Sequence, residues 1–121
     1  MPDINILVVD DEKEIADLIE IYLVSDGYKV FKAENAARGL EILAKEDIHL
    51  VLLDITMPGR SGLEVLEEML SLVPNIRVIM CSAVEQEMMI QKALTIGAAD
   101  FIVKPFKADE FSRIVNRCLE Q

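Results

Sequence analysis

Five apolar segments alternate along this chain with segments whose apolar residues recur at helical spacing, and this alternation limits the fold more than any other feature. The first apolar run, residues 4–9, is rich in β-branched side chains, as strands are. The residues after it repeat at the spacing of one helix face: Ile15, Leu18, Ile19, Tyr22 and Leu23. Alternating strands and helices imply right-handed crossovers, so we expect a parallel sheet covered by helices on both faces.

The expected strands are residues 4–9, 28–33, 48–53, 76–81 and 101–103. A helix is expected after each of them, and several helix ends are marked. Gly27 and Gly97 are placed to end the first and fourth helices, and Asn35 and Ser61 to begin the second and third. No linker or repeat interrupts the chain. Residues 1–121 are therefore expected to form one α/β domain, a doubly wound five-stranded parallel sheet with five helices.

Composition argues against several classes of function. The net charge of −10 disfavours direct binding to nucleic-acid phosphates, which requires a basic face. No apolar stretch approaches the roughly 20 residues of a membrane span, and no secretory signal is expected at the N-terminus. Cys81 and Cys118 are not at metal-binding spacing and are expected to be buried thiols in a reducing compartment. These features together favour a cytoplasmic protein without membrane or nucleic-acid contacts.

Polar and charged residues stand at the ends of four of the expected strands. Asp10 and Asp11 follow the first strand and Asp54 follows the third, while Ser82 and Lys104 end the fourth and fifth. In an open parallel sheet, ligands bind beyond the carboxyl ends of the strands, where the strand order reverses. The flavodoxin-like order 2-1-3-4-5 makes the first and third strands neighbours, so we expect the three aspartates to meet in one crevice.

Three carboxylates in one crevice repel one another, by about 4 kcal/mol per pair at close range and intermediate dielectric. A divalent cation reverses this cost, and oxygen ligands without His or Cys suit Mg²⁺. We expect Asp10 and Asp11 to hold the metal and Asp54, alone on a central strand, to accept a phosphoryl group. Each residue taken singly has an ordinary structural explanation, such as helix capping, and only their joint placement favours a site.

Four motifs occur in order along the chain. They are Val-Asp-Asp-Glu at 9–12, Leu-Asp-Ile-Thr-Met-Pro-Gly at 53–59, Cys-Ser-Ala at 81–83 and Asp-Phe-Ile-Val-Lys-Pro-Phe at 100–106. In order and spacing these motifs resemble those of the CheY-like receiver domain of bacterial two-component response regulators. The resemblance covers the whole chain. The resemblance implies that Asp54 is the phosphoacceptor. It also implies that Mg²⁺ is held by Asp10, Asp11, Asp54 and the backbone carbonyl of Thr56.

The resemblance further implies a switch. Lys104 would pair with the phosphoryl oxygens, and Ser82 would hydrogen-bond the phosphoryl group and draw in its loop. Phe101 would be the aromatic residue that moves inward with that loop. The surface that changes would be the face formed by the helix at 85–96, the strand at 101–103 and the last helix.

The same resemblance implies partners. The phosphoryl donor would be a histidine kinase or a histidine phosphotransfer protein. The output would act on a protein partner or on an effector domain that this chain does not contain, so the chain fits a stand-alone receiver or the receiver of a longer regulator. It would not be an enzyme in the usual sense, since it would catalyse only its own phosphoryl transfer and dephosphorylation.

Two positions depart from common members of the family. Phe101 stands where many members have Tyr, so this side chain lacks a hydroxyl to hydrogen-bond in the inward position. Val84 is apolar at a position that, together with Thr56, tunes the attack of water on the phosphoaspartate. Slower hydrolysis is therefore expected than in members with an acid or amide there.

Three other functions compete with this interpretation. An aspartyl phosphatase would need a second acid two residues after its nucleophile, where Thr56 stands. A flavodoxin-like electron carrier would need a Ser/Thr/Gly-rich phosphate loop after the first strand, where Asp10, Asp11 and Glu12 stand. A receiver-like module that has lost phosphorylation is disfavoured because the key residue types are all present.

Overall fold

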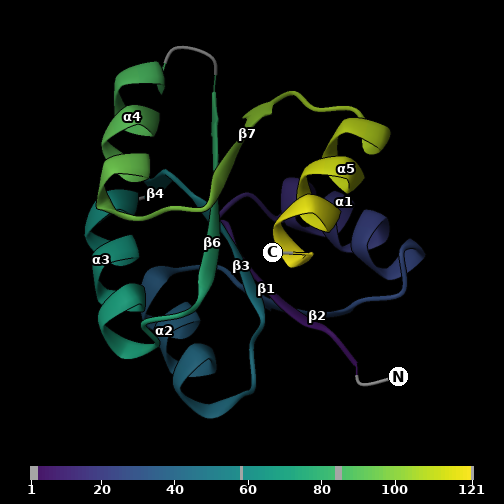
Figure 1. Ribbon diagram of the computed structural model, residues 1–121, viewed down its shortest axis with the longest axis horizontal. Coiled ribbons are helices and arrows are strands. Elements are labelled where there is room, and N and C mark those ends of the chain that lie inside the picture. The colour runs from purple at the N-terminus through teal and green to yellow at the C-terminus, as the bar shows by residue number, and fades with distance from the viewer. Residues whose placement is uncertain (1–2, 58, 84–85, 121) are drawn as a thin grey trace.

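The computed structural model describes residues 3–57, 59–83 and 86–120 (Figure 1). Within these ranges the helices are α1 (Lys13–Ser25), α2 (Ala36–Lys45), α3 (Gly62–Leu72), α4 (Glu87–Ile96) and α5 (Ala108–Leu119). The longest of them, α1, has 13 residues. In the described part of the chain no helix is long and apolar enough to cross a membrane.

A five-stranded sheet forms the centre of the described chain. Its strands are β1 (Asn5–Val9), β2 (Lys29–Ala33), β3 (Leu50–Asp54), β6 (Arg77–Ala83) and β7 (Asp100–Lys104). Their order is β2-β1-β3-β6-β7, and every neighbouring pair is parallel. Counted along the sheet strands alone, this is the order 2-1-3-4-5, which confirms the predicted flavodoxin-like fold. The direction in which successive strands are added to the sheet reverses between β1 and β3, which are neighbours in the sheet.

Helices cover both faces of the sheet, and each layer has its own core. In Figure 1, α2, α3 and α4 lie on one side of the sheet and α1 and α5 on the other. Alternate strand residues divide between the two cores, because successive side chains point to opposite faces. Val51 and Leu53 of β3 belong to the cluster with α2, α3 and α4, whereas Leu50 and Leu52 belong to the cluster with α1 and α5.

The helix ends agree with most of the sequence signals. Asn35 Oδ1 accepts a hydrogen bond from the Arg38 N–H at 2.8 Å and begins α2. Ser61 Oγ accepts from the Leu63 N–H at 3.2 Å and begins α3, one residue earlier in the helix than a capping box predicts. Gly97 ends α4 with φ of +136°, a conformation that side chains disfavour.

The element boundaries differ from expectation chiefly near the strand ends. β7 is one residue longer at each end than the predicted 101–103, and β6 continues to Ala83, two residues beyond the predicted end. α4 is described from Glu87, and residue 85, the expected start of this helix, lies outside the described residues. The predicted loop at 55–60 contains two short antiparallel strands, β4 (Thr56–Met57) and β5 (Arg60–Ser61). The residues added at the carboxyl ends, Ser82, Ala83 and Lys104, lie at the edge of the sheet where the polar residues gather, whereas Asp100 lies at the opposite edge.

Both cysteines are buried free thiols, as predicted. Burial raises the pKa of the Cys81 thiol to about 12, with Lys104 opposing the shift. Burial also raises the pKa of Cys118. The thiolate is the reactive form of cysteine, so both residues are suited to packing and poorly suited to chemistry.

Candidate functional site

Acidic side chains meet at the carboxyl ends of β1 and β3. Asp10 directly follows β1 and Asp54 is the last residue of β3, and the register pairs Val9 with Leu53 one position earlier. Both carboxylates are buried, since only 3% of Asp10 and 5% of Asp54 is exposed. Carboxylate oxygens of Asp10, Glu12 and Asp54 lie within 4.8 Å of one another. This confirms the predicted convergence for two of the three aspartates.

Lys104, the last residue of β7, reaches this cluster from across β6. Its Nζ lies 3.2 Å from Asp10 Oδ2, 3.6 Å from Glu12 Oε1 and 3.7 Å from Asp54 Oδ2. The lysine side chain is only 16% exposed, so these contacts form in a poorly solvated place. One ammonium therefore faces three carboxylates, and the cluster keeps a net negative charge.

The environment of Asp54 makes its carboxylate costly to ionise. Burial raises the pKa of Asp54 to about 6, and the Asp10 charge adds to this increase. Lys104 and a hydrogen bond from the Thr56 N–H, 3.2 Å from Asp54 Oδ1, act in the opposite direction. Burial lowers the pKa of Lys104, but the charges of Asp54 and Asp10 outweigh it and the net shift is upward. The lysine therefore stays charged near neutral pH.

The backbone after Asp54 is held by a close approach of α3. The Gly62 N–H donates to the carbonyl of Ile55 at 3.0 Å. A Cβ on Gly62 would lie 2.6 Å from that carbonyl oxygen and 2.7 Å from the Ile55 Cα, closer than such atoms can approach. Only glycine fits here, and the start of α3 thereby holds in place the segment that carries Asp54 and Thr56.

Ser82 lies in the neighbouring strand β6, one residue beyond Cys81, which pairs with Asp54 in the sheet. It is buried, and among the described residues its hydroxyl has no hydrogen-bond partner. Buried hydroxyls are normally paired, so this one calls for an explanation. Phe101, on β7, is half-buried and packs against the core that contains α2, α3 and α4. Phe101 therefore belongs to the helical layer of α2, α3 and α4, and it does not contribute to the acidic cluster.

The structure differs from expectation at the second aspartate. Asp11 is exposed and lines a pocket beside Asp54, but its carboxylate is not among the three that cluster most closely. Glu12 takes that place. Glu12 occurs in the Val-Asp-Asp-Glu motif at 9–12, but no role was predicted for it.

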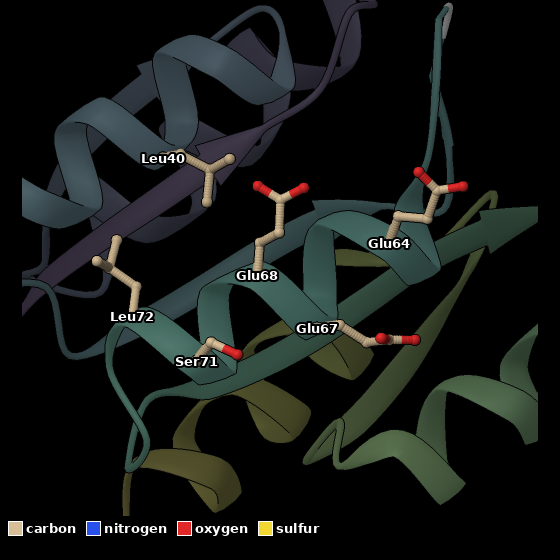
Figure 2. A pocket seen from close by; sticks show the side chains of 6 residues that line it. All are labelled: Leu40, Glu64, Glu67, Glu68, Ser71 and Leu72. Carbon is tan, nitrogen blue, oxygen red and sulfur yellow. The ribbon is translucent and has the colours of Figure 1, made fainter.

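The pocket over this cluster has a volume of about 290 Å³. Its lining residues are Asp11, Glu12, Asp54, Thr56, Ala83, Gln86 and Lys104. Gln86 was not predicted to belong to the site, since it has no motif of its own and lies after the strand end. A wider but shallow and open depression of about 700 Å³ runs along the surface of α3, with Leu40 of α2 at one side (Figure 2). It shares no residue with the acidic site.

The chain matches the family described as the response regulator receiver domain over residues 6–116. It therefore belongs to the receiver-domain family of two-component response regulators. Among curated relatives, chemotaxis protein CheY of Bacillus subtilis (strain 168) is 41% identical over 95% of this chain and 97% of its own length. Sporulation initiation phosphotransferase F of the same organism is 39% identical over 95% and 93%.

Similar proteins include both longer chains and single receiver domains. Regulatory protein VanR of Enterococcus faecium is 44% identical, but the match covers 85% of this chain and 44% of VanR. Among solved structures, the receiver domain of NtrX from Brucella abortus superposes with a TM-score of 0.93 at 37% identity, over 96% of this chain and 98% of that one. Receiver domains thus occur in such relatives both alone and as part of longer chains.

Proposed function

We propose that this receiver domain is a phosphorylation-dependent signalling switch that accepts a phosphoryl group on Asp54. The observation that supports this most is the buried Asp54 carboxylate, 3.7 Å from the Lys104 ammonium at the mouth of a pocket. A phosphoryl group adds about two negative charges, which require nearby cations. Lys104 supplies one such cation. We propose a histidine kinase or a histidine phosphotransfer protein as the donor.

The transfer itself needs little from the protein beyond position and charge. An Asp54 oxygen forms a bond to phosphorus while the bond from phosphorus to the donor's imidazole nitrogen breaks. The electron pair of the broken bond stays on the imidazole, which takes a proton from solvent. Lys104 neutralises charge on the phosphoryl oxygens. We propose that the domain catalyses only this transfer and its own dephosphorylation.

The chemistry of the donor set fits Mg²⁺. The available ligands are carboxylate and carbonyl oxygens, which magnesium prefers, and the carboxylates of Asp10, Glu12 and Asp54, within 4.8 Å of one another, favour a cation between them. We propose that Asp10, Asp11, Asp54 and the Thr56 carbonyl hold the ion. When bound, Mg²⁺ would neutralise charge on the phosphoryl oxygens and on Asp54.

The switch would begin at Ser82. Its buried hydroxyl has no hydrogen-bond partner within residues 3–57, 59–83 and 86–120, and it is available to donate to a phosphoryl oxygen on Asp54. Movement of this strand end would open space for Phe101 to turn inward, and so alter the face formed by α4, β7 and α5. Met88 on α4 is 76% exposed and offers an adaptable apolar contact to a partner on that face. We propose that this partner is a downstream protein or an effector domain, in the cytoplasm.

The direct test is intact mass after incubation with acetyl phosphate and Mg²⁺. The wild type should gain one labile phosphoryl group, and Asp54→Asn should gain none. Asp47→Asn is a matched control, because the Asp47 side chain is 91% exposed and lies outside the pocket. No adduct on the wild type, or an adduct that persists in Asp54→Asn, would contradict the proposal.

A further inference from the structure

Gln86 spans the pocket beside Asp54. Its Oε1 accepts a hydrogen bond from the Ala83 N–H at 2.9 Å, and its Nε2 donates to Thr56 Oγ1. Gln86 stands at the N-cap position of α4, yet its side chain makes no capping bond to that helix. The carboxamide instead connects the end of β6 with β4. Both anchoring residues line the same pocket as Asp54 and Lys104.

The Ala83 N–H faces the strand that carries Asp54. Residues two apart in a strand direct their backbone polar groups to the same side. The carbonyl of Cys81 accepts from the Ile55 N–H at 2.9 Å, so the polar groups of Cys81 and Ala83 both face β3. At the level of Ala83, however, β3 has already ended at Asp54. In the described part of the chain the Ala83 amide therefore has no strand partner there, and it donates instead to Gln86 Oε1 in the pocket.

A phosphoryl group on Asp54 would compete with Gln86 for this amide. It brings three acceptor oxygens and about two negative charges into a pocket with few donors. A hydrogen bond to a charged oxygen is roughly twice as strong as one to a neutral carboxamide. The phosphoryl oxygen would therefore displace Gln86 Oε1 from the Ala83 N–H, and the link from Gln86 to Thr56 would be released with it.

We infer that Gln86 is a positioning residue that restrains the unphosphorylated site. This inference rests on the proposed function of Asp54, and it adds a residue that occupies a needed donor until the phosphoryl group arrives. By holding Ala83 and Thr56 together, Gln86 keeps the strand end in its unphosphorylated place. Its release frees the N-terminal end of α4, the helix that belongs to the proposed output face.

Three variants test the inference through the rate of phosphorylation by acetyl phosphate with Mg²⁺. Gln86→Ala removes the restraint and should raise the rate by about fivefold, the effect of one typical net hydrogen bond. Gln86→Glu keeps an acceptor for Ala83 and places a negative charge beside Asp54, so its rate should fall below that of the wild type. Gln91→Ala is the matched control, because Gln91 is an exposed glutamine of α4 outside the pocket.

A second measurement needs no phosphorylation. Hydrogen exchange of the Ala83 amide, followed by NMR, should be faster in Gln86→Ala than in the wild type and in Gln91→Ala. A purely structural role for Gln86 would instead lower the melting temperature and speed exchange at many amides together.

The outcomes separate the two proposals. A wild type that takes no phosphoryl group overturns the proposed function and, with it, the restraint. A wild type that is phosphorylated, with an unchanged or slower rate in Gln86→Ala, overturns only the inference about Gln86, as does an unchanged Ala83 amide. The rate order Ala, Gln, Glu from fast to slow, with exchange altered at Ala83, supports it.

Discussion

Lys104 Nζ lies closer to Asp10 Oδ2, at 3.2 Å, than to Asp54 Oδ2, at 3.7 Å. The lysine that would serve the phosphoryl group is therefore shared with a second buried carboxylate when no phosphoryl group is present. An arriving phosphoryl group would attract this ammonium more strongly than either carboxylate does, because it carries about two charges. Phosphorylation would therefore move the Lys104 ammonium from Asp10 and Asp54 toward the phosphoryl oxygens.

The stability of the metal-free protein should depend on the ionisation of Asp54. Burial raises the pKa of Asp54 to about 6 from the usual 3.8. Between these values the folded state holds a proton that the unfolded chain has released, so stability falls as pH rises from about 4 to about 7. The corresponding free energy is about 3 kcal/mol at most. Asp54→Asn should escape this loss.

Urea unfolding in the presence of a chelator checks this expectation. The stability of Asp54→Asn relative to the wild type should be greater at pH 7.5 than at pH 4.5. Asp47→Asn, at an exposed site, should show no such difference. An Asp54→Asn effect of equal size at both pH values would contradict the prediction.

Magnesium affinity should distinguish Asp11 from Glu12. Glu12 Oε1 lies 3.6 Å from Lys104 Nζ, so its charge is already partly neutralised, whereas Asp11 is exposed at the pocket. We expect Asp11→Asn to weaken Mg²⁺ binding by about tenfold or more, and Glu12→Gln to weaken it much less. Calorimetric titration with magnesium chloride measures both. A larger loss of Mg²⁺ affinity in Glu12→Gln than in Asp11→Asn would contradict the prediction and identify Glu12 as the metal ligand.

Most of the sheet, and the meeting of Asp10 with Asp54, could be predicted because both follow from strand order and strand ends. The β4–β5 pair could not, since two-residue strands show no hydrophobic period. The position of Glu12 in the cluster depends on a side-chain direction at the start of α1, and the bridging contacts of Gln86 depend on a side-chain direction at the start of α4. Such directions arise from tertiary packing and leave no periodic signal.

Removing the Ser82 hydroxyl should not destabilise the resting protein. A buried hydroxyl without a partner carries an uncompensated desolvation cost, so Ser82→Ala should be neutral or more stable by roughly 1 kcal/mol. Ser112→Ala is the contrasting control, because Ser112 Oγ donates to Asp26 Oδ2 at 2.6 Å and this bond would be lost. Urea unfolding compares the two variants. A large loss of stability in Ser82→Ala would show that its hydroxyl is already hydrogen-bonded in the resting state.

Adding a methyl group at Gly62 should disturb the site as well as the fold. The new Cβ would meet the backbone of Ile55, which cannot move without displacing Asp54, so Gly62→Ala should cost more than about 2 kcal/mol. At Gly39, also in a helix, a Cβ would meet only the side chain of Val9, at 2.8 Å. Gly39→Ala should therefore cost less. Thermal unfolding ranks the variants, and equal losses would contradict the backbone argument.

Dephosphorylation should be slow in this protein. Val84 lies outside the described residues, so the expectation rests on its apolar side chain alone. Val84→Glu should hydrolyse its phosphoaspartate several times faster than the wild type, because an acid can orient the attacking water. Loss of the adduct mass with time, after removal of the phosphodonor, measures both rates. Equal lifetimes would contradict this expectation.

The separate cores on the two faces of the sheet have a consequence for how this protein meets its partners. Phe101 packs into the layer of α2, α3 and α4, whereas its neighbour Ile102 packs with α1 and α5. A rearrangement of Phe101 would thus deform one layer and leave α1 in place. A protein that binds to α1 could remain bound through an entire cycle of phosphorylation. A protein that binds to α4 would instead bind and dissociate as the phosphoryl group is added and removed.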